Sequence, residues 1–290
     1  MQIDMRERAV AFYRQKDKLW FLIWLAGLAV MGFWCTLFLN RPAFLLLQAA
    51  FANTLLACLC AVVSSLLLGW SVGVLLFLLE DRHRLLYLSL TFVLNLIRSI
   101  PQIVGILIGY VILTLLIEQG VLQSRQAQLV WMALVISVFV FLEIADLVRE
   151  RIAYYNKLDF VPAMLCCGIK ERRIINREIL WKNSRSHLLN KLVSVFGAAV
   201  FLQCSIDFIV SVGLSTDVSL SNFPVTLGSL LAKLDSKQDI LAIGTALSGV
   251  TSFGSLLFQH LQGISTAFVI VFTLFCLYKI SNGLVRRYRL

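Results

Sequence analysis

Charged residues are scarce in this sequence. Only 14% of its 290 residues are Asp, Glu, Lys or Arg, whereas 59% are hydrophobic. Because water-soluble domains carry about 25% charged residues, this composition excludes an ordinary soluble domain and indicates a membrane protein with several spans. The net charge of +10 does not indicate nucleic-acid binding, because the basic residues stand between hydrophobic runs, where they set membrane topology.

Several motifs that carry chemistry are also absent. The sequence has no GxxxxGK[ST] phosphate loop and no GxSxG nucleophile motif, so we expect neither an ATPase site nor a catalytic serine in this chain. Its three histidines and seven cysteines show no HExxH motif and no zinc-ligand spacing, so we expect no metal and no bound cofactor. The cysteines lie in apolar runs or in a loop expected inside the cell, so we expect no disulfide framework.

Hydrophobic runs that can cross a bilayer recur along the chain. A spanning helix needs about 20 apolar residues, and six runs approach or exceed that length. The predicted spans are 19–39, 53–79, 102–117, 127–148, 188–212 and 264–280. We interpret the shorter apolar run 85–97 as a helix near the inner membrane face, and Pro101 predicts a bend near Ile100. The expected fold class is therefore all-α, with about six transmembrane helices.

The distribution of basic residues predicts the orientation. With the N-terminus inside, the inner segments hold 22 Lys and Arg residues and the outer segments hold four, which is the positive-inside pattern. Residues 1–18 are then a cytoplasmic segment without a cleavable signal peptide, 19–285 the membrane domain and 286–290 a cytoplasmic tail. We expect residues 214–262 to be external, with 240–258 either external or re-entrant.

The long basic loop 149–187 has the pattern helix, glycine, helix. Asp159 is expected to cap a short helix that has Pro162 in its first turn, and Gly168 is expected to end it. Residues 170–182 predict a second helix with one apolar side. A short helix at the inner face suits docking into a groove on a cytoplasmic partner; the alternative is a solvated loop whose arginines only fix topology.

Two stretches of this loop carry a resemblance to a known family. The run from Asp159 to Gly168, DFVPAMLCCG, and the run from Arg173 to Lys182, RIINREILWK, resemble the EAA motif of permease subunits of type I ABC importers. Pro162, Met164 and Trp181 stand where that motif has glutamate, alanine and proline.

Other stretches extend the resemblance over roughly residues 50–285. Arg98-Ser-Ile-Pro101 is similar to the start of the third span in many such permeases. The runs 205–213 and 226–232 look most like the dipeptide, oligopeptide and nickel branch, whereas the short external turn after Asn40 leaves methionine- or phosphonate-type permeases open.

The resemblance implies a fold, a site and a set of partners. The fold would be the type I importer permease fold in a bacterial inner membrane, with a cytoplasmic coupling helix. ATP and Mg²⁺ would be held by a separate ATPase, and further partners would be a second permease subunit, an external solute-binding protein and membrane lipid. The implied ATPase-coupling residues are Asp159, Ala163, Gly168, Arg173 and Ile179, and the implied pathway or gating residues are Arg98, Pro101 and Asp207.

Structural roles and other classes of function are alternatives to these assignments. Asp207 lies in a span, where an ionisable group is a functional candidate, but it could also be a carboxylate reached by water. Glu143 and Asp146 lie within a helical turn of Arg149, which predicts an ion pair at the inner edge. From other classes, a single-chain secondary transporter, an intramembrane enzyme and a scaffold protein remain open, although the spans hold few residues that an enzyme would need.

Overall fold

The computed structural model describes residues 15–213, 223–232, 244–245, 247–249 and 261–288, and every regular element within them is helical. Five helices are long and apolar enough to cross a membrane, and the bent pair α4–α5 makes six if it counts as one span. This confirms an all-α chain with the character of a multi-pass membrane protein. The expectations for residues 1–14, for most of 214–260 and for the last two residues lie outside the described part.

The helices divide into long ones and the short ones of a loop. The long helices are α2 (Lys16–Phe38), α3 (Arg41–Arg82), α4 (Arg84–Ser99), α5 (Gln102–Glu118), α6 (Arg125–Asn156), α9 (Arg185–Gly213) and α13 (Leu261–Tyr288). The short ones are α7 (Phe160–Cys166), α8 (Glu171–Arg173), the π-helix η1 (Ile174–Asn183) and α10 (Leu227–Leu231).

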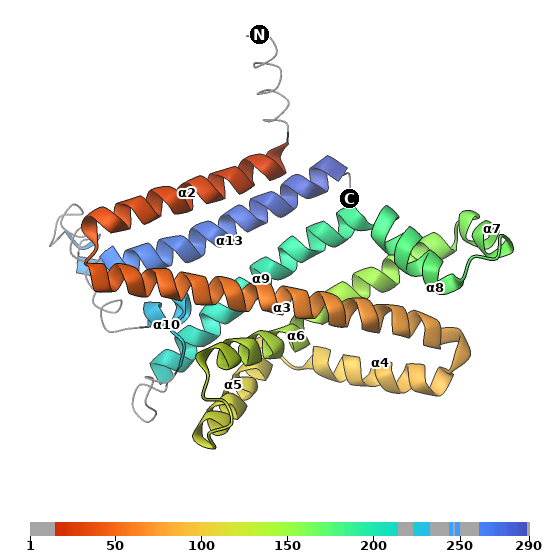
Figure 1. Cartoon of the computed structure of the whole chain (residues 1–290), viewed down its shortest axis with the longest axis horizontal. Helices are drawn as coiled ribbons and strands as arrows, with labels where there is room; N and C mark the ends of the chain where they lie inside the picture. Colours follow the sequence, from red (N-terminus) through yellow and green to blue (C-terminus); the bar gives the residue numbers. More distant parts are fainter. Residues whose placement is uncertain (1–14, 214–222, 233–243, 246, 250–260, 289–290) are drawn as a thin grey trace, which may run out of the picture.

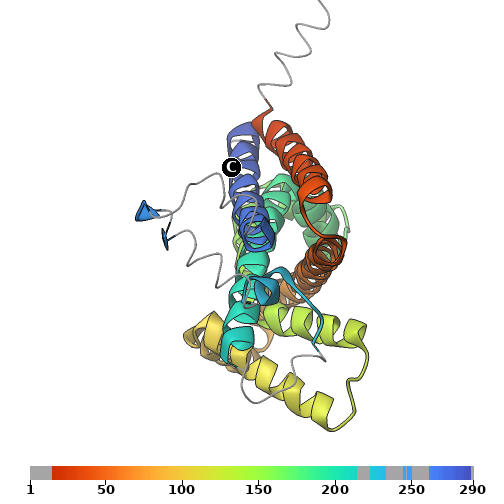
Figure 2. The same ribbon diagram turned by 90° about the vertical axis from the view of Figure 1, so that its left-hand side faces the viewer.

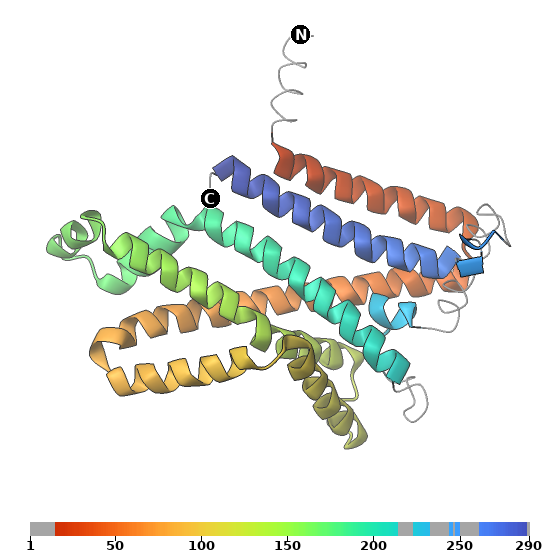
Figure 3. The ribbon, with the colours of Figure 1, turned by 180° about the vertical axis from the view of Figure 1, so that it is seen from behind.

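Most long helices run lengthwise beside one another, so the molecule has two distinct ends (Figures 1 and 3). At one end, here the α7 end, lie α7, α8 and the turn between α3 and α4, and toward it α2 begins and α13 finishes. At the other, the α10 end, lie α10 and the turn between α2 and α3. The start of α2, the turn between α3 and α4, the α7 loop and the finish of α13, all of which the sequence places on the inner side, therefore lie toward one end.

Helix α3 is longer than the sequence suggests. Its 42 residues correspond to about 63 Å of helix, because the apolar residues 43–52 continue directly into the predicted span 53–79. Pro42 does not interrupt the helix, since it stands in the first turn, where its missing N–H has no intrahelical partner to lose.

The bend predicted near Ile100 is confirmed. Ile100 is extended, with φ −81° and ψ 125°, and the axes of α4 and α5 meet at 93°. Helix α4 runs back alongside the end of α3 (Figures 1 and 3). Helix α5 and the start of α6 then project to one side of the bundle, as the end-on view shows (Figure 2).

Small residues let the helices approach closely. A Cβ atom on Gly69 of α3 would lie 2.7 Å from the Cβ of Ile144 on α6, and one on Gly73 would lie 2.7 Å from Val148. Helices α3 and α6 therefore form a tightly packed pair. Gly105 and Gly109 of α5 pack as closely on α6, because a Cβ on either would overlap a side chain of that helix.

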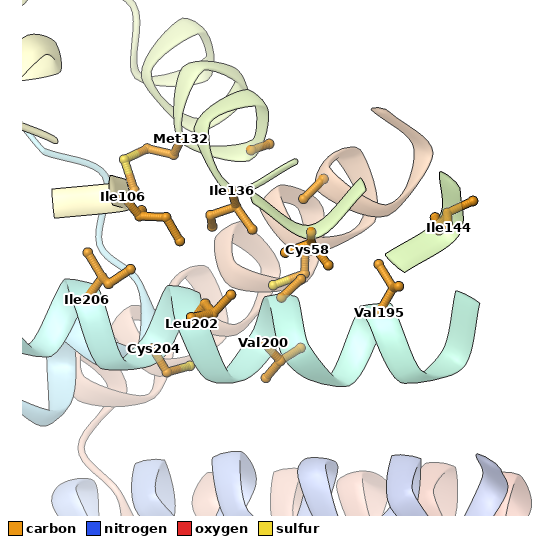
Figure 4. Close-up of a cluster of buried hydrophobic side chains, with 14 of the residues drawn as sticks. Cys58, Ile106, Met132, Ile136, Ile144, Val195, Val200, Leu202, Cys204 and Ile206 are labelled. Carbon is orange, nitrogen blue, oxygen red and sulfur yellow. The ribbon is translucent and has the colours of Figure 1, made fainter. Parts of the chain in front are cut away.

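The apolar core lies where α9 meets α3, α5 and α6. Figure 4 shows Ile206 of α9 beside Ile106 of α5, with Ile136 of α6 next to them. Each of these three isoleucines is fully buried. In contrast, large apolar side chains of α2 such as Val30 (68% exposed) and Phe33 (66% exposed) point outward, as a lipid-facing helix requires.

Candidate functional site

The loop between α6 and α9 projects from the α7 end of the bundle (Figure 1). Helix α6 continues to Asn156, eight residues beyond the apolar run, and so carries the loop beyond the predicted span. Helix α7 follows almost at once. After Gly168, α8 and η1 lead back to Arg185, where α9 begins.

The predicted end of α7 is confirmed at Gly168. Its φ of +78° is a left-handed conformation that glycine adopts without the penalty other residues incur. The Gly168 N–H donates to the Leu165 carbonyl at 2.9 Å, and the Ile169 N–H donates to the Met164 carbonyl at 3.2 Å. Asp159 does stand at the N-cap position, but its side chain makes no capping hydrogen bond.

Helix α7 exposes most of its surface. Of its seven residues only Val161 is buried, while Leu165 is 46% exposed, and Ala163, Cys166 and the following Cys167 are exposed as well. An apolar side chain this exposed on a helix beyond the predicted span is available to a partner. Ala163 thus lies on a free surface of α7.

The π-helix η1 is the part of the loop that packs in the core. Its buried residues are Ile174, Ile175, Ile179 and Leu180. A hydrogen bond of 2.7 Å from Trp70 Nε1 of α3 to Asn176 Oδ1 fixes one side of it. Ile179, predicted as a coupling residue, is only 1% exposed, so its side chain packs in the core of the chain. Arg173, also predicted, is exposed.

Aromatic and basic side chains tie the end of α6 to the start of α9. The Arg151 guanidinium lies 5.3 Å from the ring centre of Tyr154 and 5.4 Å from that of Tyr155, and its Nε donates to Ser184 Oγ at 3.5 Å. The Tyr155 hydroxyl donates to the Asn183 carbonyl at 3.3 Å. These contacts hold together the two ends of the loop, namely the end of α6 and residues 183–184.

The ion pairs of α6 differ from those expected. Asp146 pairs with Arg98 at 2.8 Å and Glu143 with Lys191 at 3.0 Å, so the predicted pairing with Arg149 is wrong. The Arg149 guanidinium instead donates to the Tyr87 hydroxyl of α4 at 3.0 Å. The reason is tertiary, since the neighbouring helices α4 and α9 bring partners that spacing along α6 cannot reveal.

Arg98 and Pro101 both lie at the elbow between α4 and α5. Both are exposed, and the side chains of Arg98 and Asp146 are 52% and 55% accessible. A bend leaves backbone groups of both helix ends without helical partners. Polar groups of this kind at membrane depth need protein or water around them.

Asp207 is the centre of a buried polar cluster at the α10 end. It is 2% exposed, and it accepts a hydrogen bond of 2.7 Å from Gln203 Nε2. The Thr226 hydroxyl, at the start of α10, is a second hydrogen-bond partner of the carboxylate. A Cβ on Gly228 of α10 would lie 2.8 Å from the Cβ of Asp207, so α10 lies directly against it.

Helix α3 binds the start of α10 through two hydrogen bonds. Asn53 Nδ2 donates to the Val225 carbonyl at 2.8 Å, and the Leu227 N–H donates to Thr54 Oγ1 at 2.9 Å. Sequence reasoning missed these two residues and also Gln203. The four-residue spacing of Gln203 and Asp207 in an apolar run is a signal for that pair, whereas nothing in the sequence links residues 53 and 54 to 225–227.

The predicted site residues thus fall in three separate places. The α7 loop and α10 lie toward opposite ends of the bundle, and the elbow between α4 and α5 lies between them (Figure 1). Asp207 belongs to the α10 end, because it packs against Gly228 of that helix. No family model matches the sequence, and no curated protein matches it. The assignment of function therefore rests on the geometry of the loop, the elbow and the buried cluster.

Proposed function

We propose that this chain is a permease subunit of an ATP-driven importer of the ABC type. It would form part of the substrate pathway and would dock on a separate ATPase through the α7 loop. The cargo class that the sequence resemblance favours is that of the dipeptide, oligopeptide and nickel branch, with methionine- or phosphonate-type importers as alternatives. The membrane would be a bacterial inner membrane, with the α7 end in the cytoplasm.

The observation that carries the proposal is the exposed helix α7 in a loop whose other part, η1, is anchored by buried side chains. A loop that only fixes topology needs basic residues but no defined shape. Here α7 ends at a left-handed glycine, and four buried apolar residues of η1 hold the loop in place. Keeping a short helix exposed on a rigid base is what a docking element requires.

The packing of α3 and α6 supports a mechanical role for this loop. Helix α6 leads directly into α7, and the Trp70–Asn176 hydrogen bond joins η1 to α3. Because Gly69 and Gly73 seat α3 tightly on α6, a displacement of α7 would move the two long helices as one body. Closure of an ATPase dimer on ATP would then shift the spans between two states of access.

The exposed thiols of α7 provide a test. Cys166 and Cys167 are exposed, whereas four of the five other cysteines are buried and Cys60 is partly buried. We expect a membrane-impermeant maleimide that carries a photoreactive benzophenone, attached to these thiols in inside-out membrane vesicles and then irradiated, to join α7 to an ATPase that mass spectrometry can identify. The matched control is the double variant Cys166→Ser, Cys167→Ser, in which the adduct should disappear.

Two results would count against the proposal. One is a lack of any adduct with an ATPase although both thiols react fully. The other is a reaction of these thiols in right-side-out vesicles, because it would place the α7 end outside the cell.

A second function is favoured by one specific observation. Asp207 is a buried carboxylate in a spanning helix, and such groups mark ion pathways in cation-coupled secondary transporters. That alternative predicts uptake driven by an ion gradient in vesicles that contain no ATPase. The permease proposal predicts uptake only when ATP is hydrolysed.

A further inference from the structure

Asp207 is buried without a positively charged partner. Of the ion pairs formed by the described residues, none includes Asp207, although Asp17, another buried aspartate, pairs with Arg287 at 2.8 Å. The Cys58 thiol of α3 lies near both Asp207 and the Cys204 thiol of α9, and neither thiol brings a positive charge. An isolated charge in such a site is costly unless something neutralises it.

The side-chain oxygen of Gln203, next to Asp207 on α9, has no hydrogen-bond partner. Gln203 is fully buried, and its Nε2 donates to Asp207 Oδ2 at 2.7 Å. The other atom of the same amide, Oε1, has no hydrogen-bond partner. Oε1 thus belongs to the amide whose nitrogen is bound to the carboxylate. The site therefore offers oxygen acceptors, and no basic side chain among the described residues pairs with them.

We propose that Asp207 and Gln203 form a binding site for one monovalent cation, which is either a proton or an alkali cation such as Na⁺. A single charge would neutralise the single carboxylate, and the oxygen ligands suit a hard cation. A transition metal does not fit, since no three His, Cys, Asp or Glu side chains among the described residues are placed so that they could hold one. This inference goes beyond transport driven by ATP and does not depend on it.

Helix α10 covers this site. Gly228 packs against both the Cys204 carbonyl and the Cβ of Asp207, and Thr226 reaches the carboxylate. Two hydrogen bonds, from Asn53 to Val225 and from Leu227 to Thr54, attach the element to α3. A cation therefore enters or leaves when α10 separates from α3 or α9, so occupancy of the site and the position of α10 are linked.

The test is the thermal stability of the purified chain in detergent, without any partner. The Tm is measured as NaCl replaces choline chloride at constant ionic strength, and separately between pH 8 and pH 5 in choline chloride. A ligand that binds only the folded state raises the Tm, by about 5 °C at a hundredfold excess over its Kd. The test variant is Asp207→Asn, and the control Glu143→Gln removes a half-exposed carboxylate that pairs with a lysine.

The outcomes separate the two cations. If the site binds an alkali cation, Na⁺ raises the Tm of the wild type and of Glu143→Gln but not of Asp207→Asn. If it binds a proton, acidification raises the Tm of the wild type and of Glu143→Gln more than that of Asp207→Asn, and Na⁺ has no effect. Equal responses of the wild type and Asp207→Asn to both titrations would overturn the site.

A second variant covers the case in which Asp207→Asn does not fold. Gln203→Leu keeps the carboxylate but removes the unpaired oxygen and the amide donor. We expect it to shift the midpoint of the cation titration by about tenfold or more, since a buried ligand or donor is lost. An unchanged midpoint in this variant would show that Gln203 is not a ligand and would refute the proposed cation site.

Discussion

Substitution of Ile179 by alanine should loosen the α7 loop without unfolding the bundle. Ile179 is 1% exposed, and its neighbours Ile174 and Leu180 are 1% and 0% exposed, so the shortened side chain leaves a cavity. Truncation of a buried isoleucine to alanine costs about 2–5 kcal/mol. The loss falls on η1, which is attached to the bundle by its buried side and by the hydrogen bond from Trp70 to Asn176.

The assay is hydrogen–deuterium exchange of the backbone amides of residues 174–183. A loss of about 3 kcal/mol in local stability raises the open population roughly a hundredfold, because every 1.4 kcal/mol is a factor of ten. The conservative control Ile179→Val should cost about 0.5–1.5 kcal/mol, so its exchange should rise about tenfold or less. Amides in the middle of α9 should exchange as in the wild type.

The same variant separates positioning from contact. If Ile179 acts only by holding η1 in place, the yield of the adduct between α7 and the ATPase should fall in Ile179→Ala and remain close to the wild type in Ile179→Val. The reasoning fails if exchange in η1 is unchanged by Ile179→Ala. It also fails if Arg173→Ala, which removes an exposed side chain, accelerates exchange as much.

Three further changes probe the loop, the α10 contact and the elbow. Gly168→Ala has open space for its Cβ but must adopt a φ of +78°, so it should destabilise the end of α7 by about 1–2 kcal/mol; exchange of the Ile169 amide measures this, and wild-type exchange would contradict it. Gly228→Leu should displace α10 from Cys204, because the new Cβ would overlap the Cys204 carbonyl. We expect a thiol reagent to reach Cys204 in this variant but not in the wild type, and equal protection in both would show that α10 is not seated there. For Arg98 and Asp146, both about half exposed, a double-mutant cycle should give a coupling below about 1 kcal/mol in thermal or denaturant unfolding; a larger value would mean that the pair is shielded from water.

The features that local sequence could predict are those decided by local chemistry. Pro101 removes a backbone donor and restricts Ile100, so the bend followed from two residues. Gly168 ended α7 because glycine alone enters the left-handed region cheaply. The long apolar helices followed from hydrophobic run length. In each case the cause and its effect lie within a few residues of one another.

The features that the sequence could not predict depend on distant partners. Asp146 was expected to pair along its own helix, but α4 presents Arg98 to it. Ile179 belongs to the apolar side of the helix predicted over 170–182, and only the packing of η1 against α6 and α9 shows that it is buried in the bundle. The setting of Asp207 depends on α10, which reaches it from residues 226–228, and on Asn53 and Thr54, which are about 170 positions away from that element.

The most direct test of the proposed function is to purify the tagged protein from its native membrane in mild detergent and to identify its companions by mass spectrometry. The proposal predicts an ABC-type ATPase in near-equal amount, lost when Gly168 is replaced by a bulky charged residue although the permease remains in the membrane. A second permease subunit or a solute-binding protein in the same preparation would narrow the cargo. A protein that is purified alone, or only with copies of itself, would contradict the proposal and leave ion-coupled transport through Asp207 as the function to test.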